Sequence, residues 1–478
     1  MPVTFREKSL IVESDNDSEL LRETAPLITL QHMSQVCRGW RDQVINSPSL
    51  WASSIDLTFM DQRTPYWRDE VIRRTGNACL TVVADMRDQD NFPLDFFEDL
   101  ILVHWERIRK LHFVVTKLDN NVLTTRARAI ILSALRRPAP NLESCTAVAL
   151  HEPSDEASTA NFSILFSGDA PRLRSFILHG SMPKFTGLTN IRKLLLFDGH
   201  FNLDINSLLN CLRCMPKLEE LAIESKITRR SGPDNDHHAV RLPRLNTITV
   251  YTTTNSLPLL VRYIIPAAGC RLISVGQQFD TVSDRRIASH ALAYSNFFRT
   301  YTSLRDIGYI SYHIEHGLPT FGHEPFVDLR VQCCDSPEYH NMHATEHHHV
   351  FIESDVSLQR NRNKLSSLYA VAQALSQCDL SSVTFLHLVL EENTIPTSCT
   401  QFHAFLLALP FVETLRTDLS TLQFLIDIQS TFSDTIVLPG LMTVRLTTTG
   451  NGRKGALRDF MIYRQSIGFP IQLVDIED

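Results

Sequence analysis

The sequence has no long apolar run and no excess of positive charge, and each absence excludes a class of protein. Among its 478 residues no stretch approaches the roughly 20 apolar residues of a membrane-spanning helix. Residues 1–19 are charged and lack the apolar run of a signal peptide. Lysine and arginine number 46 against 53 acidic residues, a formal net charge of −7, whereas nucleic-acid binding needs a basic surface. We therefore expect a cytoplasmic or nuclear protein that binds neither membranes nor nucleic acids.

The motifs of common catalytic machinery are also missing. There is no Gly-x-Ser-x-Gly elbow, no Walker loop and no His-Glu-x-x-His pair. Gly450, Gly452 and Gly455 form a glycine-rich string after an expected strand, but no acidic residue follows at the spacing of a nucleotide site. We interpret them as a turn, and expect neither an enzyme nor a bound cofactor.

The ten cysteines have no regular spacing, so they do not predict a disulfide framework, and we expect reduced, mostly buried thiols. One stretch is dense in residues that bind zinc, namely Cys333, Cys334, His340, His343, His347, His348 and His349. Their spacing matches none of the paired patterns of zinc sites. A solvated polar loop is the favoured interpretation, and a metal site is the alternative.

The first 24 residues are polar, and a periodic pattern of apolar residues begins after them. Residues 1–24 predict a loose tail. The apolar residues Leu27, Leu30, Met33, Val36 or Cys37, Trp40 and Val44 recur at steps of three and four, which predicts one helix face. Pro48 should end this helix near Asn46, because the residue before a proline avoids helical geometry.

A second pattern repeats over most of the remaining chain. A proline is followed two places on by an apolar residue, and in most cases by two more at a step of three and then two. The prolines are Pro140, Pro171, Pro216, Pro243, Pro410 and Pro439, and units without proline are centred on Leu111, Leu194, Ile307 and Leu386. Neighbouring units lie roughly 27 to 34 residues apart, at the upper end of the leucine-rich-repeat period.

Each unit predicts a short strand with its alternate apolar side chains on one face. Proline is expected at the first position of the strand, where no ladder hydrogen bond is lost. Amphipathic helices, such as that of Leu208 and Leu212 or that of Phe402 and Leu406, precede several strands and should cover their apolar face. Residues 61–478 thus predict an irregular α/β solenoid of parallel strands and helices, with an irregular insertion around 311–365.

The side chains between the buried positions should form the inner face of this solenoid. As binding residues on that face we predict Lys193, Glu220, Glu224, Thr247, Thr249, Tyr251, Arg416 and Arg445, with Ala222, Thr414 and Thr443 beside them. Their mixed charge favours a protein partner over a polyanion. The alternative is a face that is only solvated.

Residues 25–60 carry a more specific string. It consists of Ala25-Pro26-Leu27, then Val36-Cys37-Arg38-Gly39-Trp40-Arg41, and finally Ser47-Pro48-Ser49-Leu50-Trp51. The string resembles the later part of an F-box, particularly that of the F-box-like proteins of mushroom-forming fungi, in which leucine-rich-repeat-like units follow. The family's opening Leu-Pro helix has no counterpart in residues 14–23, where only Leu20 and Leu21 are apolar neighbours.

The resemblance implies an N-terminal F-box-like helical cap and a role as substrate receptor of a cullin-RING ubiquitin ligase. In that family the cap binds the Skp adaptor and the repeats present a protein substrate. The positions that match the family's apolar residues are Pro26, Leu27, Val36, Cys37, Trp40, Leu50 and Trp51. Because the opening helix is missing, a leucine-rich-repeat scaffold protein without a ligase link is the alternative.

Overall fold

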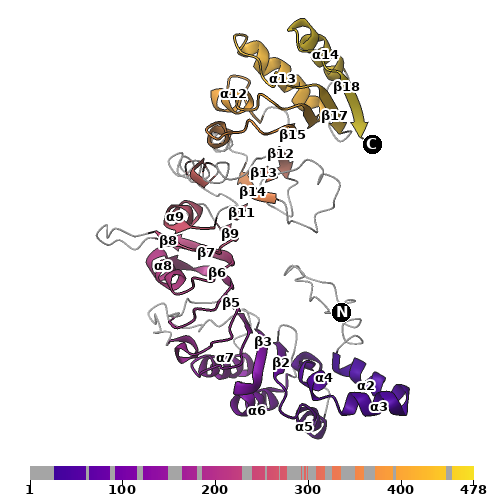
Figure 1. The fold of residues 1–478 in the computed structure, drawn as a ribbon, viewed down its shortest axis with the longest axis vertical. Coiled ribbons are helices and arrows are strands. Elements are labelled where there is room, and N and C mark those ends of the chain that lie inside the picture. Colours follow the sequence, from indigo (N-terminus) through magenta and orange to yellow (C-terminus); the bar gives the residue numbers. More distant parts are fainter. Residues whose placement is uncertain are drawn as a thin grey trace. The chain divides into compact units, whose positions relative to one another are not determined.

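The repeated apolar pattern builds β-strands in two units of the computed structural model, residues 1–191 and 192–478 (Figure 1). The residues that the structure describes are 26–60, 64–86, 92–115, 122–148, 164–179, 186–228, 239–252, 256–267, 270–276, 292, 295–297, 299, 308–317, 326–334, 350–359, 372–390, 394–447 and 455–477. The predicted loose tail, residues 1–24, lies outside them.

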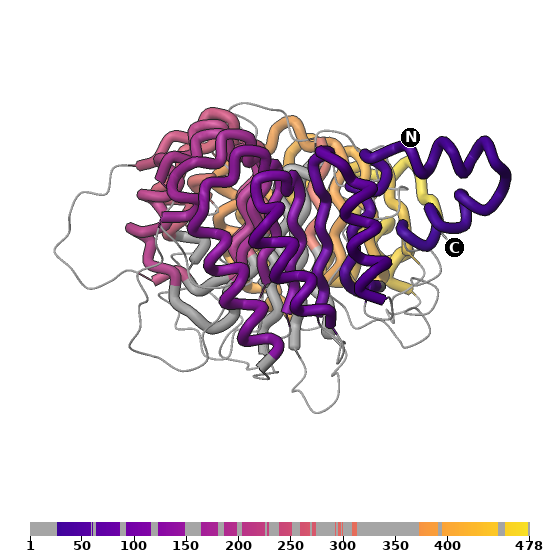
Figure 2. The backbone as a smooth tube through the Cα atoms, turned by 90° about the horizontal axis from the view of Figure 1, so that it is seen from below, coloured from indigo at the N-terminus to yellow at the C-terminus, as the bar shows by residue number. Residues whose placement is uncertain are grey.

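Unit 1 begins with three short helices, α2 (Pro26–Val36), α3 (Arg38–Ile45) and α4 (Pro48–Ala52). Its strands are β1 (Ile55–Asp56), β2 (Leu80–Asp85), β3 (Ile108–Val114), β4 (Ser144–Val148) and β5 (Ser175–His179), and each pairs in parallel with the next. Helices α5 (Pro65–Arg74), α6 (Leu94–His104) and α7 (Val122–Ala134) connect them. Figure 2 shows these turns of unit 1 side by side, from indigo to purple.

Unit 2 repeats the same plan over a longer sheet. Its strands are β6 (Lys193–Asp204), β7 (Glu220–Thr228), β9 (Thr247–Thr252), β11 (Arg271–Gly276), β12 (Tyr309–Gly317), β13 (Phe326–Cys334), β14 (Val350–Gln359), β15 (Phe385–Leu390), β16 (Thr414–Thr417), β17 (Thr443–Thr447) and β18 (Leu473–Glu477). The described helices are α8 (Ile205–Arg213), α9 (Ser256–Tyr263), α12 (Thr400–Leu407), α13 (Leu419–Thr431) and α14 (Ala456–Ser466). A small second sheet pairs β8 (Val240–Arg241) with β10 (Ile264–Ile265).

The parallel order of unit 2 is interrupted once, within the predicted insertion. The spatial order is β6-β7-β9-β11-β14-β13-β12-β15-β16-β17-β18. Strand β13 runs antiparallel to both of its neighbours, while β14 pairs in parallel with β11 and β12 in parallel with β15. The insertion predicted around 311–365 contains β13, β14 and most of β12. Cys333 and Cys334, expected in a loop, are the last residues of β13.

The prolines of the repeat lie before the strands, which corrects their predicted position. Pro216 precedes β7 by four residues, and the N–H of Leu218 donates to the carbonyl of Met215 at 3.1 Å. The equivalent bond joins Leu245 to Leu242 and Leu441 to Leu438, each at 3.1 Å. Proline therefore occupies the second position of a β-turn, where its fixed φ favours the turn.

The apolar residues of the repeat form the core, as predicted. Leu221, Ile248 and Val444 are each at most 2% exposed, and all three belong to unit 2. Helices α8 and α12 bury their apolar sides, through Leu208 and Phe402 among others. In unit 1 the rings of Phe97 on α6 and Phe113 on β3 stack with centroids 5.6 Å apart. Helix-to-strand packing of this kind buries the face that a single turn leaves open.

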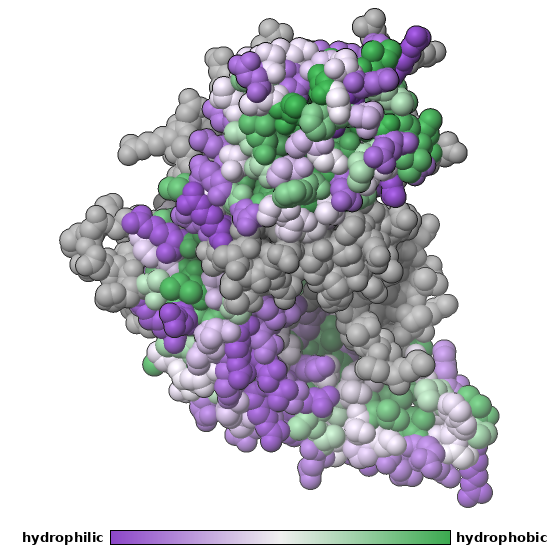
Figure 3. All heavy atoms as spheres, turned by 45° about the horizontal axis from the view of Figure 1, so that its top comes forward, coloured by the Kyte–Doolittle hydropathy of each residue, from purple (hydrophilic) through white to green (hydrophobic). Residues whose placement is uncertain are grey.

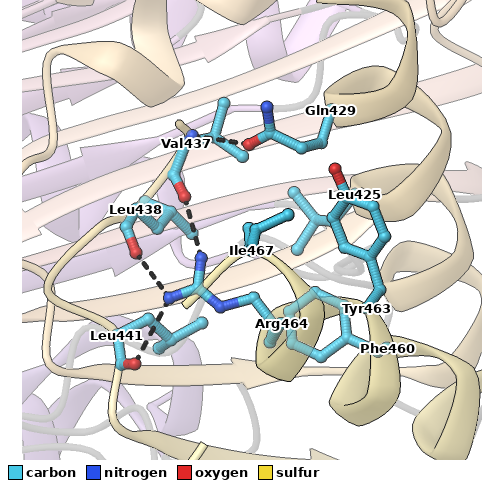
Figure 4. Close-up of a pocket in the computed structure, with 9 residues that line it drawn as sticks. All are labelled: Leu425, Gln429, Val437, Leu438, Leu441, Phe460, Tyr463, Arg464 and Ile467. Atoms are coloured by element: carbon cyan, nitrogen blue, oxygen red, sulfur yellow. Dashed lines mark hydrogen bonds between the residues drawn. The ribbon is translucent and has the colours of Figure 1, made fainter. Parts of the chain in front are cut away.

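A buried arginine that donates to backbone carbonyls ties the last helix to the preceding turn (Figure 4). The Arg464 guanidinium on α14 donates to the carbonyls of Val437 and Leu438 at 3.1 Å, and its Nε donates to Phe469 at 3.1 Å. Burial lowers the pKa of Arg464 to about 10, so the side chain stays charged at neutral pH. Among the described residues, the acceptors of its hydrogen bonds are backbone carbonyls.

Replacing this arginine should cost substantial stability. We expect Arg464→Met to lower the free energy of unfolding by about 3 kcal/mol, because several buried carbonyls lose a charged donor. Urea unfolding followed by circular dichroism measures the change. Arg458→Met, at an exposed position of the same helix, should stay within about 0.5 kcal/mol of the wild type. Equal losses in both variants would contradict the anchoring role.

A buried histidine is expected to make unit 2 sensitive to acid. The imidazole of His403 on α12 stacks on the ring of Phe432 with centroids 4.0 Å apart, and its Nε2 lies 2.9 Å from the hydroxyl of Thr435. Burial lowers the pKa of His403 below its usual value. The folded protein therefore takes up a proton at this site less readily than the unfolded chain does.

Stability should thus fall on acidification through the ordinary histidine pKa of about 6.5. Above that pH the imidazole is neutral in the folded and the unfolded state, so His403 contributes its full amount to the free energy of unfolding. Below that pH the unfolded chain binds a proton more readily than the folded protein does, and the free energy of unfolding decreases. We expect the urea midpoint to fall between pH of about 7.5 and about 5.5, and to fall less in His403→Gln, which cannot titrate. An identical pH dependence in the two proteins would contradict this role.

Candidate functional site

The single helix predicted from Leu27 to Val44 is in fact two helices. Cys37 has an extended backbone, with φ −158° and ψ 170°, and caps α3 by accepting the N–H of Trp40 at 3.5 Å. The break changes the direction in which later side chains point. Leu27, Leu30 and Val44 are buried, whereas Trp40 is 50% exposed, so the expectation that they share one face was wrong. The end at Asn46 before Pro48 is confirmed.

Most of the predicted adaptor residues are accessible to a partner. Val36 on α2 is 68% exposed and Leu50 on α4 is 40% exposed. With Trp40 and the exposed Cys37 they form what we call the N-terminal apolar group. Pro26, at the start of α2, is exposed as well. Figure 3 shows hydrophobic side chains on the surface of this part of unit 1, at the lower right.

The other two predicted residues are buried inside unit 1. Leu27 is buried, and Trp51 is 3% exposed. The indole N–H of Trp51 donates to the carbonyl of Val44 at 2.8 Å, and the guanidinium of Arg74 on α5 lies 4.6 Å from its ring centroid. Trp51 therefore joins α3, α4 and α5. Sequence alone did not separate these packing residues from the exposed ones.

The eight cysteines whose side chains the structure describes are free, and five of them are buried. Burial raises the pKa of Cys145 and Cys270 to about 12. Cys211 on α8 and Cys214 at its C-cap form a Cys-x-x-Cys pair, although no regular cysteine spacing was predicted from the sequence. Cys211 is buried, and burial raises its pKa well above the usual range. Buried thiols of this kind are inert, which leaves Cys37 as the exposed one.

Thiol modification should distinguish these cysteines. We expect a maleimide to label Cys37 in the native protein well before Cys145 or Cys270, because the reactive thiolate is suppressed in the buried residues. Peptide mass spectrometry over a time course measures the order. Labelling of Cys145 at the same rate as Cys37 would contradict the packing described above.

The His- and Cys-rich segment, for which a polar loop was favoured over a metal site, lies largely outside the described residues. Its five histidines lie outside them, as do the side chains of Cys333 and Cys334. Elsewhere in the described part of the chain, no three histidine, cysteine or acidic residues are grouped so that they could hold a metal ion. Among the same residues, no helix is long and apolar enough to cross a membrane.

The side of the strands that was predicted as the inner face of the solenoid is called the strand face below. At the start of unit 2, charged residues on the strand face pair with each other. Lys193, Glu220 and Thr247 are register partners on β6, β7 and β9. The ammonium of Lys193 lies 3.3 Å from the carboxylate of Glu220. Glu224 is half-buried, while Thr249 is 8% exposed and therefore offers little surface to a partner. The side chain of Tyr251 lies outside the described residues.

The same face carries a different set of groups over the last strands. His387, Arg416, Arg445 and Asp475 are register partners on β15, β16, β17 and β18. Arg416 and Arg445 are both half-buried. Thr414 and Thr443 form the preceding row, together with Phe385. Two of the eight predicted binding residues thus meet as neighbours at this end of the sheet.

No protein-family model and no curated protein matches the chain. A solved structure that does match is the leucine-rich repeat-containing protein LegL7 from Legionella pneumophila, at 13% identity and a TM-score of 0.21, over 73% of this chain and 87% of that chain. At that TM-score the likeness carries no argument. The repeat character of this protein rests on its own strands and turns.

Proposed function

We propose that the protein is a protein-interaction module that serves as the substrate receptor of a cullin-RING ubiquitin ligase. In this proposal residues 26–52 bind a Skp-type adaptor, and the strand face of the repeats binds the protein to be ubiquitinated. The observation that carries the proposal is the exposure of Val36, Trp40 and Leu50 on three short helices whose sequence resembles an F-box. The role implies a cytoplasmic or nuclear location.

Physical considerations favour a binding role for the N-terminal apolar group. Exposed tryptophan beside aliphatic side chains is typical of the anchor residues that dominate interface energies. Trp40 is half exposed although Trp51, eleven places on, is buried and hydrogen-bonded. The fold therefore does not require Trp40 in its interior, and a partner that covers it would gain the energy of removing its ring from water.

A scaffold protein without a ligase link is the second candidate. It is favoured by the lack of a Leu-Pro helix in residues 14–23, since that helix supplies much of the adaptor contact in the F-box family. In this case the strand face would bind a partner protein, and the N-terminal apolar group would not bind the adaptor. Adaptor binding separates the two candidates directly.

Truncation of the exposed anchors should weaken adaptor binding. We expect the double variant Trp40→Ala, Leu50→Ala to reduce the affinity for a Skp-type adaptor at least tenfold, which corresponds to about 1.4 kcal/mol or more. Isothermal titration calorimetry with the purified adaptor measures it. Circular dichroism should show an unchanged fold, because both side chains are exposed.

The matched control is Val103→Ala. Val103 lies on α6 of the same unit and is 72% exposed, but it belongs to no F-box-like string. The affinity of the Val103→Ala variant for the adaptor should equal that of the wild type. If the wild-type protein forms no complex with the adaptor at micromolar concentrations, the ligase role is refuted and the scaffold role takes its place.

A further inference from the structure

We propose that the outer edge of β18 binds an extended segment of a partner protein as an added β-strand, with a basic residue opposite Asp475 and apolar residues on either side of it. This edge is not part of the N-terminal apolar group, so the inference does not depend on adaptor binding. It rests on the backbone groups along the edge, on the exposed apolar side chains of the last turn and on the register between β17 and β18.

Strand β18 has a strand neighbour on one side only among the described residues. It pairs in parallel with β17 and stands last in the sheet order (Figure 1). The N–H of Leu473 donates to the carbonyl of Met442 at 3.2 Å, so the odd-numbered residues of β18 bond to β17. The N–H and C=O groups of Val474 and Ile476 therefore point to the other edge, where a further strand can bond to them.

The side chains of the last turn do not protect this edge. Proteins usually blunt an edge strand with lysine, proline or a bulge, and the terminal turn of a solenoid usually has a polar outer face. Strand β18 contains neither lysine nor proline, and its register with β17 is unbroken. Leu473 and Ile476 are 58% and 61% exposed, and Ile462 on α14, the helix of the same turn, is exposed as well.

The first strand of unit 1 shows the opposite arrangement. Ile55 on β1 and Leu57, which follows it, are buried, and helix α2 contacts the strand. The protein thus covers the apolar residues of that terminal strand with its own helices. A strand added to β18 would likewise remove Leu473 and Ile476 from water, which favours binding in proportion to the apolar area covered.

The register indicates which apolar positions the added strand should have. Val474 is the Cα partner of Val444, and Ile476 is the Cα partner of Leu446. Both rows are apolar on the side of the core, where Val444 and Leu446 are buried. Apolar residues on the next strand would continue these rows, because cross-strand pairs of apolar side chains stabilise a sheet.

Asp475 indicates the charge of the added strand. Its carboxylate lies 3.9 Å from the Arg445 guanidinium on β17, and its side chain is 54% exposed. A carboxylate can accept several hydrogen bonds, so this ion pair leaves acceptor positions on Asp475. A lysine or arginine on the next strand would face the carboxylate from the side opposite to Arg445, and opposite charges across a strand pair are stabilising.

A second copy of this chain fits the edge less well than a different partner does. Residues Leu473–Glu477 of β18 contain two acidic residues and no basic residue. Two copies paired edge to edge through β18 would therefore offer no basic residue to Asp475 and would bring acidic residues together, which is destabilising. An alternating apolar and basic segment of another protein meets both requirements, since backbone bonds provide affinity and alternate side chains provide specificity.

The test uses the full chain and three fluorescently labelled peptides. The first has the core Ile-Val-Lys-Val-Ile between polar flanks, and the second has glutamate in place of the lysine. The third is the first peptide with its core amides N-methylated, which removes the backbone donors and keeps the side chains. Fluorescence anisotropy should show that the lysine peptide binds at least tenfold more tightly than either of the others.

Variants of β18 test the edge itself. The N–H of Ile476 points away from β17, so Ile476→Pro keeps the ladder to β17 and removes a donor from the outer edge. It should weaken binding of the lysine peptide at least tenfold. Asp475→Asn should reduce the preference for the lysine peptide over the glutamate peptide to less than threefold. The matched control is Leu102→Ala, at an exposed apolar position of α6 in unit 1, which should change the affinity less than twofold.

Equal affinity for the lysine peptide and its N-methylated form would overturn the inference, and this comparison on the wild-type protein holds even if Ile476→Pro does not fold. Unchanged binding in a folded Ile476→Pro variant would also overturn it. So would a dimer in sedimentation velocity that is lost in Ile476→Pro, because a second copy would then occupy the edge. Adaptor titration of the same samples tests the ligase role separately, since it depends on Trp40 and Leu50.

Discussion

Burial of each turn's apolar face against its neighbours is the constraint on which both units depend. A strand such as β7 places Leu221 and Ile223 in the core and leaves Glu220 and Ala222 on its other face. The adjacent strands then supply the hydrogen bonds that fix the register. The bonds begin before the ladder proper, where the N–H of Asn246 donates to Glu219 and that of Arg271 to Asn246. Side-chain burial and backbone pairing therefore act at the same positions.

This constraint explains why a surface can be assembled from residues far apart in sequence. Arg416 and Arg445 belong to different turns, yet the register makes them neighbours. Substitution of an outward residue leaves the apolar positions untouched, so the chemistry of the strand face can vary without loss of the core. The contrast between the paired charges of Lys193 and Glu220 and the adjacent arginines of β16 and β17 arises within one such sheet.

The sequence predicted the periodic features well and the local breaks poorly. Alternation of apolar residues identified β7, β9 and β17, because burial on one face of a strand imposes a period of two. It did not reveal that Cys37 divides the first helix, since this depends on one extended residue whose side chain can cap a new helix. Nor did it place the prolines, which lie in the turns before the strands. The register between β15, β16 and β17 needed the three-dimensional structure, because the connecting segments differ in length.

The order of strands in the middle of unit 2 has a consequence for how the chain reaches this structure. Elsewhere most strands pair with the next or the next but one along the chain, so formation can spread from one turn to its neighbour. Between β11 and β15 the order differs: the consecutive strands β12, β13 and β14 pair with one another, but β11 pairs with β14 and β12 with β15, which are distant in the sequence. The pairs β11–β14 and β12–β15 can form only after two long segments of chain have closed into loops at this junction. Closing longer loops costs more conformational entropy, which raises the barrier to folding. Assembly from the two ends of unit 2 should therefore meet at this junction last.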